Sequence, residues 1–146
     1  MSATDAFETA LLQLYFQNTN HANVGDATGL RNSTAAGSFY VSLHTADPGE
    51  AGTQTTSECA YGSYARQAVV RSAAGWTVAA ANVSNAAVIT FPTATSGTET
   101  ATHFGIGSAL TTAGNLFFKG ALTAGRAISS GITPSFAVGE LDVDVT

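Results

Sequence analysis

The sequence predicts a mostly β protein: an antiparallel β-sandwich, jelly-roll-like, with one N-terminal helix and an extended arm. From residue 39 onward, apolar and polar residues alternate with the period of two that is typical of half-buried strands. Turn-forming residues recur about every ten residues through this region, which is the spacing found in sandwiches and barrels. Helical periodicity is convincing only before residue 18, so the alternating units of a parallel βαβ fold are not expected.

The predicted helix covers residues 5–17. Thr4 or Asp5 can cap its first turn, and Glu8 lies where the helix dipole favours a negative charge. Its apolar residues follow the spacing of a single helical face: Phe7, Ala10, Leu11, Leu14 and Tyr15. An apolar face of this size is expected to be buried, so we expect Phe7, Leu11, Leu14 and Tyr15 to contact the β body or a partner protein.

Small and polar residues fill positions 18–37, which begin with the breaker cluster Asn18-Thr19-Asn20. This composition predicts a loop or an extended arm that orders on assembly. We therefore expect a helix and arm over residues 1–36 and a β-sandwich domain over residues 37–146.

The first strand of the sandwich is predicted at Phe39–His44, followed by a turn at Asp47-Pro48-Gly49-Glu50. Further strands are predicted at residues 64–71, 76–78, 88–91, 102–106, 116–122, 134–138 and 141–145. The alanine-rich residues 79–87 fit a turn region as well as a helix. The expected core is Phe39, Val41, Leu43, Val70, Trp76, Ile89, Phe91, Phe104, Ile106, Leu116, Phe118 and Leu122.

The composition excludes several function classes. Five basic and ten acidic residues give a net charge of −5, which argues against nucleic acid and anionic membranes as partners. Charged residues make up 10% of the chain, against a usual share of about a quarter. Such a lightly charged surface favours a protein that is packed against partners or copies of itself. The sequence has no secretory signal, membrane span or disulfide framework, which predicts synthesis in a reducing cytoplasm.

No motif predicts catalysis, a metal or a cofactor. His44 and His103 lie on alternating strands and can converge, but a surface or cross-strand position is the simpler interpretation. The segment Gly105-Ile106-Gly107 lacks the third glycine and the following helix of a dinucleotide loop. Its glycines are more consistent with a bulge or a close backbone approach.

Two acidic pairs offer oxygen ligands for calcium: Asp47 with Glu50, and Asp142 with Asp144. Solvated acids at a turn and at a strand edge are the simpler interpretation, and no bound metal is expected. Cys59 has no adjacent base in the sequence and is expected to be a buried apolar residue.

Several motifs together resemble a family of small tailed-bacteriophage proteins. After the apolar helix, these motifs are Tyr40-Val41-Ser42-Leu43-His44-Thr45-Ala46-Asp47-Pro48-Gly49-Glu50-Ala51-Gly52, Tyr61-Gly62-Ser63-Tyr64-Ala65-Arg66, Gly75-Trp76-Thr77-Val78, Asn85-Ala86-Ala87-Val88-Ile89-Thr90-Phe91-Pro92 and Thr102-His103-Phe104-Gly105-Ile106-Gly107. The resemblance covers residues 4–17 and 38–146. Members are usually labelled phage tail-fibre proteins, and in size and fold the chain also resembles capsid cement or decoration proteins.

The resemblance implies a structural virion component that is made in the cytoplasm of a bacterial host and is not an enzyme. We expect a capsid cement protein that binds between major capsid subunits or to other virion proteins, as a symmetric trimer or dimer. The alternative is a tail-fibre or receptor-binding module. In that case exposed Tyr61, Tyr64 or Trp76 would contact a host-surface glycan, although a core role for Trp76 is the simpler interpretation.

Overall fold

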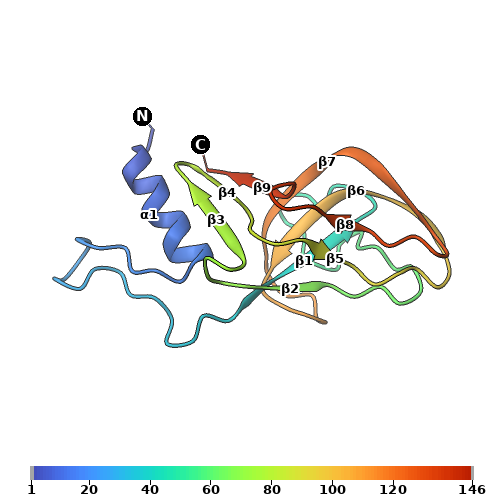
Figure 1. Cartoon of the computed structure of the whole chain (residues 1–146), viewed down its shortest axis with the longest axis horizontal. Helices are drawn as coiled ribbons and strands as arrows, with labels where there is room; N and C mark the ends of the chain where they lie inside the picture. Colours follow the sequence, from blue (N-terminus) through green and yellow to red (C-terminus); the bar gives the residue numbers. More distant parts are fainter. Residues whose placement is uncertain (1, 146) are drawn as a thin grey trace. The chain divides into compact units, whose positions relative to one another are not determined.

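The computed structural model describes residues 2–145 and confirms the predicted mostly β, antiparallel fold class with an N-terminal helix (Figure 1). In this part of the chain the helix α1 (Asp5–Phe16) precedes the strands β1 (Ser38–His44), β2 (Gln67–Val70), β3 (Trp76–Ala79), β4 (Asn82–Asn85), β5 (Ile89–Thr90), β6 (Thr98–Gly107), β7 (Leu116–Ser129), β8 (Ser135–Phe136) and β9 (Asp142–Asp144). They form a four-stranded sheet of order β2-β1-β6-β7, a three-stranded sheet of order β3-β4-β9, and the pair β5-β8.

The chain forms two compact units, and each is assembled from separate stretches of sequence. The first, here called the helix unit, comprises Met1–Ser38, Val70–Val88 and Phe136–Thr146. The second, the large-sheet unit, comprises Phe39–Val69 and Ile89–Ser135. By compactness, therefore, the helix and the arm group with β3, β4 and β9. The division into domains at residue 36 stays a prediction.

In the helix unit, α1 packs against β3 and β4 through a face different from the predicted one. Leu12 and Phe16, one turn apart, are buried, and the Phe16 ring meets the Trp76 ring edge-on at a centroid distance of 4.9 Å. Phe7 of the predicted face is 48% exposed. Apolar residues surround most of this helix, so periodicity alone could not single out the face that packs on Trp76.

The C-terminal end of α1 is held by an arginine from a distant part of the chain. Asn18 has a left-handed φ of 56°, which ends the helix close to the predicted boundary. The Arg71 guanidinium donates hydrogen bonds to the carbonyls of Leu14 (3.0 Å) and Tyr15 (2.6 Å). The last carbonyls of a helix generally need partners from outside it, and the helix dipole favours a positive charge there. Arg71 therefore caps α1.

Residues 18–37 form a loop that folds back on itself, as Figure 1 shows. His21 and Leu30 exchange two backbone hydrogen bonds of 3.0 and 2.9 Å. The Asn18 side chain donates to the Ser33 carbonyl (3.0 Å) and accepts from the Ser33 N–H (2.8 Å). Of the two forms expected for this segment, a loop or an extended arm, the structure has the loop. Side-chain amides of asparagines form hydrogen bonds with the backbone of this loop.

In the large-sheet unit, β1 pairs antiparallel with β6, and β6 pairs antiparallel with β7. Val41 lies opposite Ile106 and Leu43 opposite Phe104, and all four of these residues are buried. Alternation along β1 and β6 therefore predicted this part of the core correctly.

Two parts of the predicted core are wrong. Val70 is 42% exposed while its neighbour Val69 is buried, so the predicted phase of β2 was shifted by one residue. Leu116, Phe118 and Leu122 are only partly buried, because β7 is an edge strand of its sheet.

Strand β4 is the main element that the sequence analysis missed. Between β3 and β4, Ala80 has a left-handed φ of 53°. Two-residue hairpin turns usually contain Asn-Gly or Asp-Gly, so Ala80-Ala81 gave no turn signal. At the end of β4 the buried Asn85 amide donates to the Ala137 carbonyl (2.8 Å) and accepts from the Leu141 N–H (3.0 Å). This asparagine thereby joins β4 to the C-terminal segment.

Two phenylalanines of α1 provide a matched test of the packing. Phe16→Ala should lower the free energy of unfolding by about 3–5 kcal/mol, because it opens a cavity beside Trp76. Phe7→Ala should cost less than about 1 kcal/mol, because this ring is half exposed. Chemical denaturation of the full chain measures both. Equal losses for the two variants would show that α1 does not pack as described.

Candidate functional site

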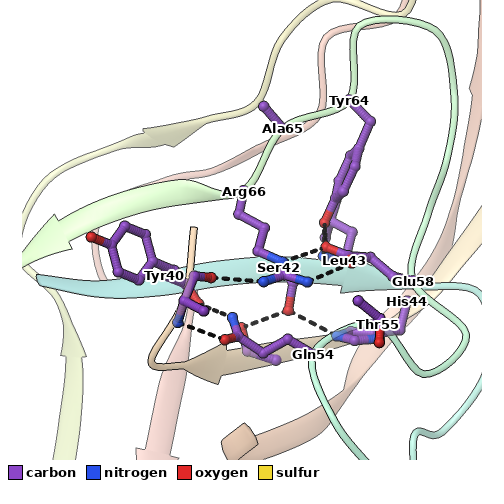
Figure 2. A network of polar contacts seen from close by, with 12 residues as sticks. Tyr40, Ser42, Leu43, His44, Gln54, Thr55, Glu58, Tyr64, Ala65 and Arg66 are labelled. Atoms are coloured by element: carbon purple, nitrogen blue, oxygen red, sulfur yellow. Dashed lines mark hydrogen bonds and ion pairs between the residues drawn. The ribbon is translucent and has the colours of Figure 1, made fainter. Parts of the chain in front are cut away.

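A cluster of buried polar side chains lies on β1 and the loops that cover it (Figure 2). Ser42, His44 and Gln54 are fully buried, and Arg66 is 5% exposed. Ser42 and His44 project from the face of β1 opposite Val41 and Leu43, since side chains alternate along a strand. Buried polar groups are costly without hydrogen-bond partners, so the partners of these side chains determine what the cluster can do.

Ser42 and His44 form a hydrogen-bonded pair. His44 Nδ1 lies 2.8 Å from the Thr56 carbonyl oxygen, which can only accept, so this nitrogen carries the proton. His44 Nε2 then accepts from Ser42 Oγ at 2.8 Å. Burial lowers the pKa of the imidazole, with Arg66 and His103 acting in the same direction and Thr56 and Glu58 against it. His44 is therefore neutral near pH 7.

This pair has the bonding of a serine nucleophile and its base, but both side chains are closed to solvent. No substrate can reach them, so their role here is structural. His44 lies opposite His103 in the β1–β6 register, which confirms the cross-strand position considered for these two histidines.

Two glycines of β6 make room for the cluster. A Cβ on Gly105 would lie 2.7 Å from both Ser42 Oγ and His44 Nε2. A Cβ on Gly107 would lie 2.3 Å from Gln54 Cδ. Such contacts are far inside van der Waals distance, so the close backbone approach predicted for Gly105-Ile106-Gly107 is confirmed.

Arg66 is the central cation of the cluster. Its Nε and Nη2 donate to the two carboxylate oxygens of Glu58 at 2.7 and 2.8 Å. Its Nη1 donates to the carbonyls of Ala109 and Thr112, both at 2.7 Å. The guanidinium therefore ties the loop before β2 to the loop after β6, using the planar fork that lysine lacks.

Tyr64 and Gln54 complete the network. The Tyr64 hydroxyl accepts from the Leu43 N–H at 3.0 Å and donates to Glu58 Oε1 at 2.9 Å. Burial raises the pKa of this phenol, which stays protonated. The Gln54 side-chain oxygen accepts from the Ala109 N–H at 2.8 Å, and the Gln54 backbone N–H donates to the Ala113 carbonyl at 2.9 Å.

A surface pocket of about 360 Å³ adjoins this network in the large-sheet unit. Its lining residues are Glu58, Tyr64, Ala65, Arg66, Leu110 and Thr111. Glu58, Arg66 and Leu110 are not among the residues for which the sequence predicted a functional role. The feature of the sequence that could have indicated this pocket is the motif Tyr61-Gly62-Ser63-Tyr64-Ala65-Arg66, because it combines aromatic rings with the planar cation of arginine.

The aromatic residues proposed as glycan contacts are not exposed. Tyr61 is 3% exposed and its hydroxyl donates to the Pro92 carbonyl at 3.1 Å. Trp76 is fully buried, which confirms its core role. Tyr64 is partly buried and its hydroxyl is used within the network. Tyr61 and Trp76 therefore do not offer exposed rings to a glycan, whereas Tyr64 lines the surface pocket and a contact through it stays a prediction.

The acidic pairs have partners other than a metal. Lys119 Nζ lies 3.0 Å from an Asp47 oxygen and 3.1 Å from a Glu50 oxygen. Asp142 and Asp144 both accept from the side-chain amide of Asn82, at 3.4 and 2.9 Å. Among residues 2–145, no three His, Cys, Asp or Glu side chains gather as metal ligands would.

The single cysteine has the environment of an unreactive thiol. Cys59 is buried, as predicted. Burial and then the nearby Glu99 carboxylate raise its pKa to about 12. The nucleophilic thiolate is therefore scarce near neutral pH.

The predicted partner-binding residues Phe7, Leu11, Leu14 and Tyr15 all lie on α1 in the helix unit. Phe7 and Tyr15 are exposed, whereas Leu11 and Leu14 are partly buried. The Phe7 ring contacts the His21 ring of the adjoining loop at a centroid distance of 5.6 Å. These four residues stay a predicted contact surface.

Breaking the buried ion pair should destabilise the fold strongly. Arg66→Lys cannot keep both bonds to Glu58 and both carbonyl bonds, and Glu58→Gln leaves the guanidinium uncompensated. Either change should lower the free energy of unfolding by about 3–5 kcal/mol. Arg31→Lys is the control, because Arg31 and Asp26 form an exposed pair with nitrogen and oxygen 3.9 Å apart. An Arg66→Lys protein as stable as this control would contradict the structural role.

The protein should lose stability in mild acid because of His44. The pKa of His44 in the folded chain lies below the ordinary 6.5. As the pH falls through 6.5, the unfolded chain therefore binds more protons than the folded chain does. The contribution of neutral His44 is thus fully present above the ordinary pKa and is lost progressively below it. Denaturation curves between about pH 8 and about pH 5 measure this slope. The slope should be shallower in His44→Gln, and an unchanged slope in that variant would refute the assignment.

Comparison with known proteins identifies a family. Residues 2–144 match the family described as podophage GP4 fiber I protein gp80. No curated protein matches the chain significantly. Among residues 2–145, no helix has the length and apolar character needed to cross a membrane. Since the match spans nearly the whole sequence, the chain belongs to this family of bacteriophage fibre proteins.

Proposed function

We propose that this protein is a structural subunit of a bacteriophage tail fibre and that it acts by binding. The observation that supports this most directly is the family match over residues 2–144. The description of that family favours the fibre alternative over the capsid cement role that size and composition had favoured. A binding role also agrees with the lightly charged surface, which suits a protein packed among other virion subunits.

The arrangement of the polar cluster supports a role without catalysis. Ser42 and His44 are paired but closed to solvent. Glu58 and Arg66 line the surface pocket, yet they neutralise each other through two short hydrogen bonds. A general acid or base needs a free position toward substrate and a pKa near the working pH. The cluster is instead built to hold loops in place.

The exposed part of α1 is the surface we propose for assembly. Leu12 and Phe16 occupy the buried side of the helix, which leaves Phe7 and Tyr15 exposed and Leu11 and Leu14 partly exposed. An apolar surface of this kind favours association in water. We propose that it contacts a second copy of this chain in a symmetric dimer or trimer.

Location in the particle tests the fibre role. Antibodies against the purified chain, viewed by immunogold electron microscopy on intact phage, should label the tail fibres. The matched control is the same labelling after the antibodies have been absorbed with purified protein. Labelling spread over the capsid would instead support the cement role and refute the fibre proposal.

A charge on the exposed helix face should weaken self-association. Phe7→Asp places a carboxylate in the proposed contact, in the first helical turn where the dipole tolerates it. Val138→Asp is the control, since Val138 is 62% exposed and lies outside α1. Sedimentation equilibrium should show a smaller mean mass for Phe7→Asp alone. A monomeric parent chain, or the same effect in both variants, would rule out this contact.

A further inference from the structure

His44 is a buried base, and its hydrogen bonds determine where a proton can be added. Its Nδ1 donates to the Thr56 carbonyl and its Nε2 accepts from Ser42 Oγ, both at 2.8 Å. A proton can therefore be added only at Nε2. The ring then becomes an imidazolium whose two nitrogens both donate, so the Ser42 hydroxyl can no longer donate to it. The bond to Thr56 is the same in both forms.

The Ser42 hydroxyl has a second acceptor within reach. Its oxygen lies 3.4 Å from the Gly105 carbonyl oxygen, against 2.8 Å from His44 Nε2. A hydroxyl rotates, and it can donate one hydrogen bond while it accepts others. When Nε2 carries a proton, Ser42 Oγ can accept from it and donate to Gly105 instead. The hydroxyl and both ring nitrogens then keep partners, which avoids the cost of an unsatisfied buried donor.

Gly105 makes this exchange possible. It lies opposite Ser42 in the β1–β6 register, so the second acceptor belongs to the neighbouring strand. A Cβ at this position would lie 2.7 Å from both Ser42 Oγ and His44 Nε2. A larger residue would therefore push the hydroxyl away from one of its two partners. The glycine leaves room for the hydroxyl, and its carbonyl is the acceptor that the charged form needs.

The surroundings of His44 determine how readily it takes the proton. Burial opposes the imidazolium most strongly and holds the pKa of His44 below the ordinary 6.5. The Thr56 carbonyl and the Glu58 carboxylate favour the charged form. Arg66 opposes it, as does His103, which lies opposite on β6. The exchange is therefore expected in mild acid and not at neutral pH.

We propose that Ser42, His44 and Gly105 form a pH-operated hydrogen-bond switch beneath the loop that carries Thr56. In mild acid a proton from solvent binds His44 Nε2, and the Ser42 hydroxyl turns from His44 to Gly105. The ring keeps its place, because Nδ1–H donates to Thr56 before and after. The loop therefore stays closed, and the long hydrogen bond from Ser42 to Gly105 shortens.

A pH titration of the full, isotope-labelled chain, followed by NMR, tests the switch. The ring nitrogen signals of His44 should show a proton on Nδ1 alone at about pH 8 and an imidazolium in mild acid. The Gly105 carbonyl signal should shift with the same midpoint. The amides of Thr45 and Cys59, at the two ends of the loop, each donate a backbone hydrogen bond of 2.8 Å. They should stay protected from exchange through that midpoint, and their exposure there would show that acid opens the loop instead.

The sign of the change in Ser42→Ala makes the test specific. If the hydroxyl can turn, the variant loses a bond to the charged ring that is stronger than the bond to the neutral ring. Proton binding to His44 should then weaken at least about threefold. If the hydroxyl can only donate, its loss relieves the charged form, and proton binding should strengthen. Ser63→Ala removes an exposed hydroxyl of the same unit and should titrate like the parent chain.

Two results would overturn the proposal. One is proton binding in Ser42→Ala that is as tight as in Ser63→Ala, or tighter. The other is a Gly105 carbonyl signal that does not move when His44 titrates. The second result comes from the parent chain, so it decides the question even if Ser42→Ala does not fold.

Discussion

The buried ion pair between Arg66 and Glu58 is the interaction on which the large-sheet unit depends. A guanidinium with a side chain only 3% exposed needs partners for its N–H groups, and here a carboxylate and two backbone carbonyls accept from four of the five. Those partners belong to two loops that have no regular secondary structure. Because the charge of Arg66 must be compensated, these two loops take one fixed course. Hydrophobic packing alone would leave that course variable.

The helix unit is held together by the packing of a large aromatic ring and not by a buried ion pair. Trp76 begins β3 and is fully enclosed, with the edge of the Phe16 ring against it. Arg71, five residues earlier, caps the helix that carries Phe16. A short stretch of chain therefore both fixes the end of α1 and provides the surface on which the helix rests.

The sequence predicted the fold class and the apolar side of β1 and β6, because period-two alternation records directly which residues face a core. It could not predict the packed face of α1, since apolar residues on most sides of a helix leave the choice to tertiary contacts. The hairpin at Ala80 was missed for lack of turn residues. At the candidate site the motif Tyr61–Arg66 marked the right segment, but its aromatic and charged side chains turned out to face inward. Whether a polar residue points into a network or into solvent depends on partners distant in sequence, such as Ala109 and Thr112 for Arg66.

Because the two units are interleaved along the sequence, few genetic exchanges between related chains can leave both units intact. The chain passes from one unit to the other after Ser38, Val69, Val88 and Ser135. A single genetic exchange at most interior points would therefore combine parts of both units from different parents, leaving neither with a matched core. An exchange between Phe16 and Trp76 separates that packed pair of rings, and one between Glu58 and Arg66 separates the buried ion pair as well. Variation is consequently easiest in surface loops such as the one carrying Leu110, whose side chains can change while its flanks stay fixed.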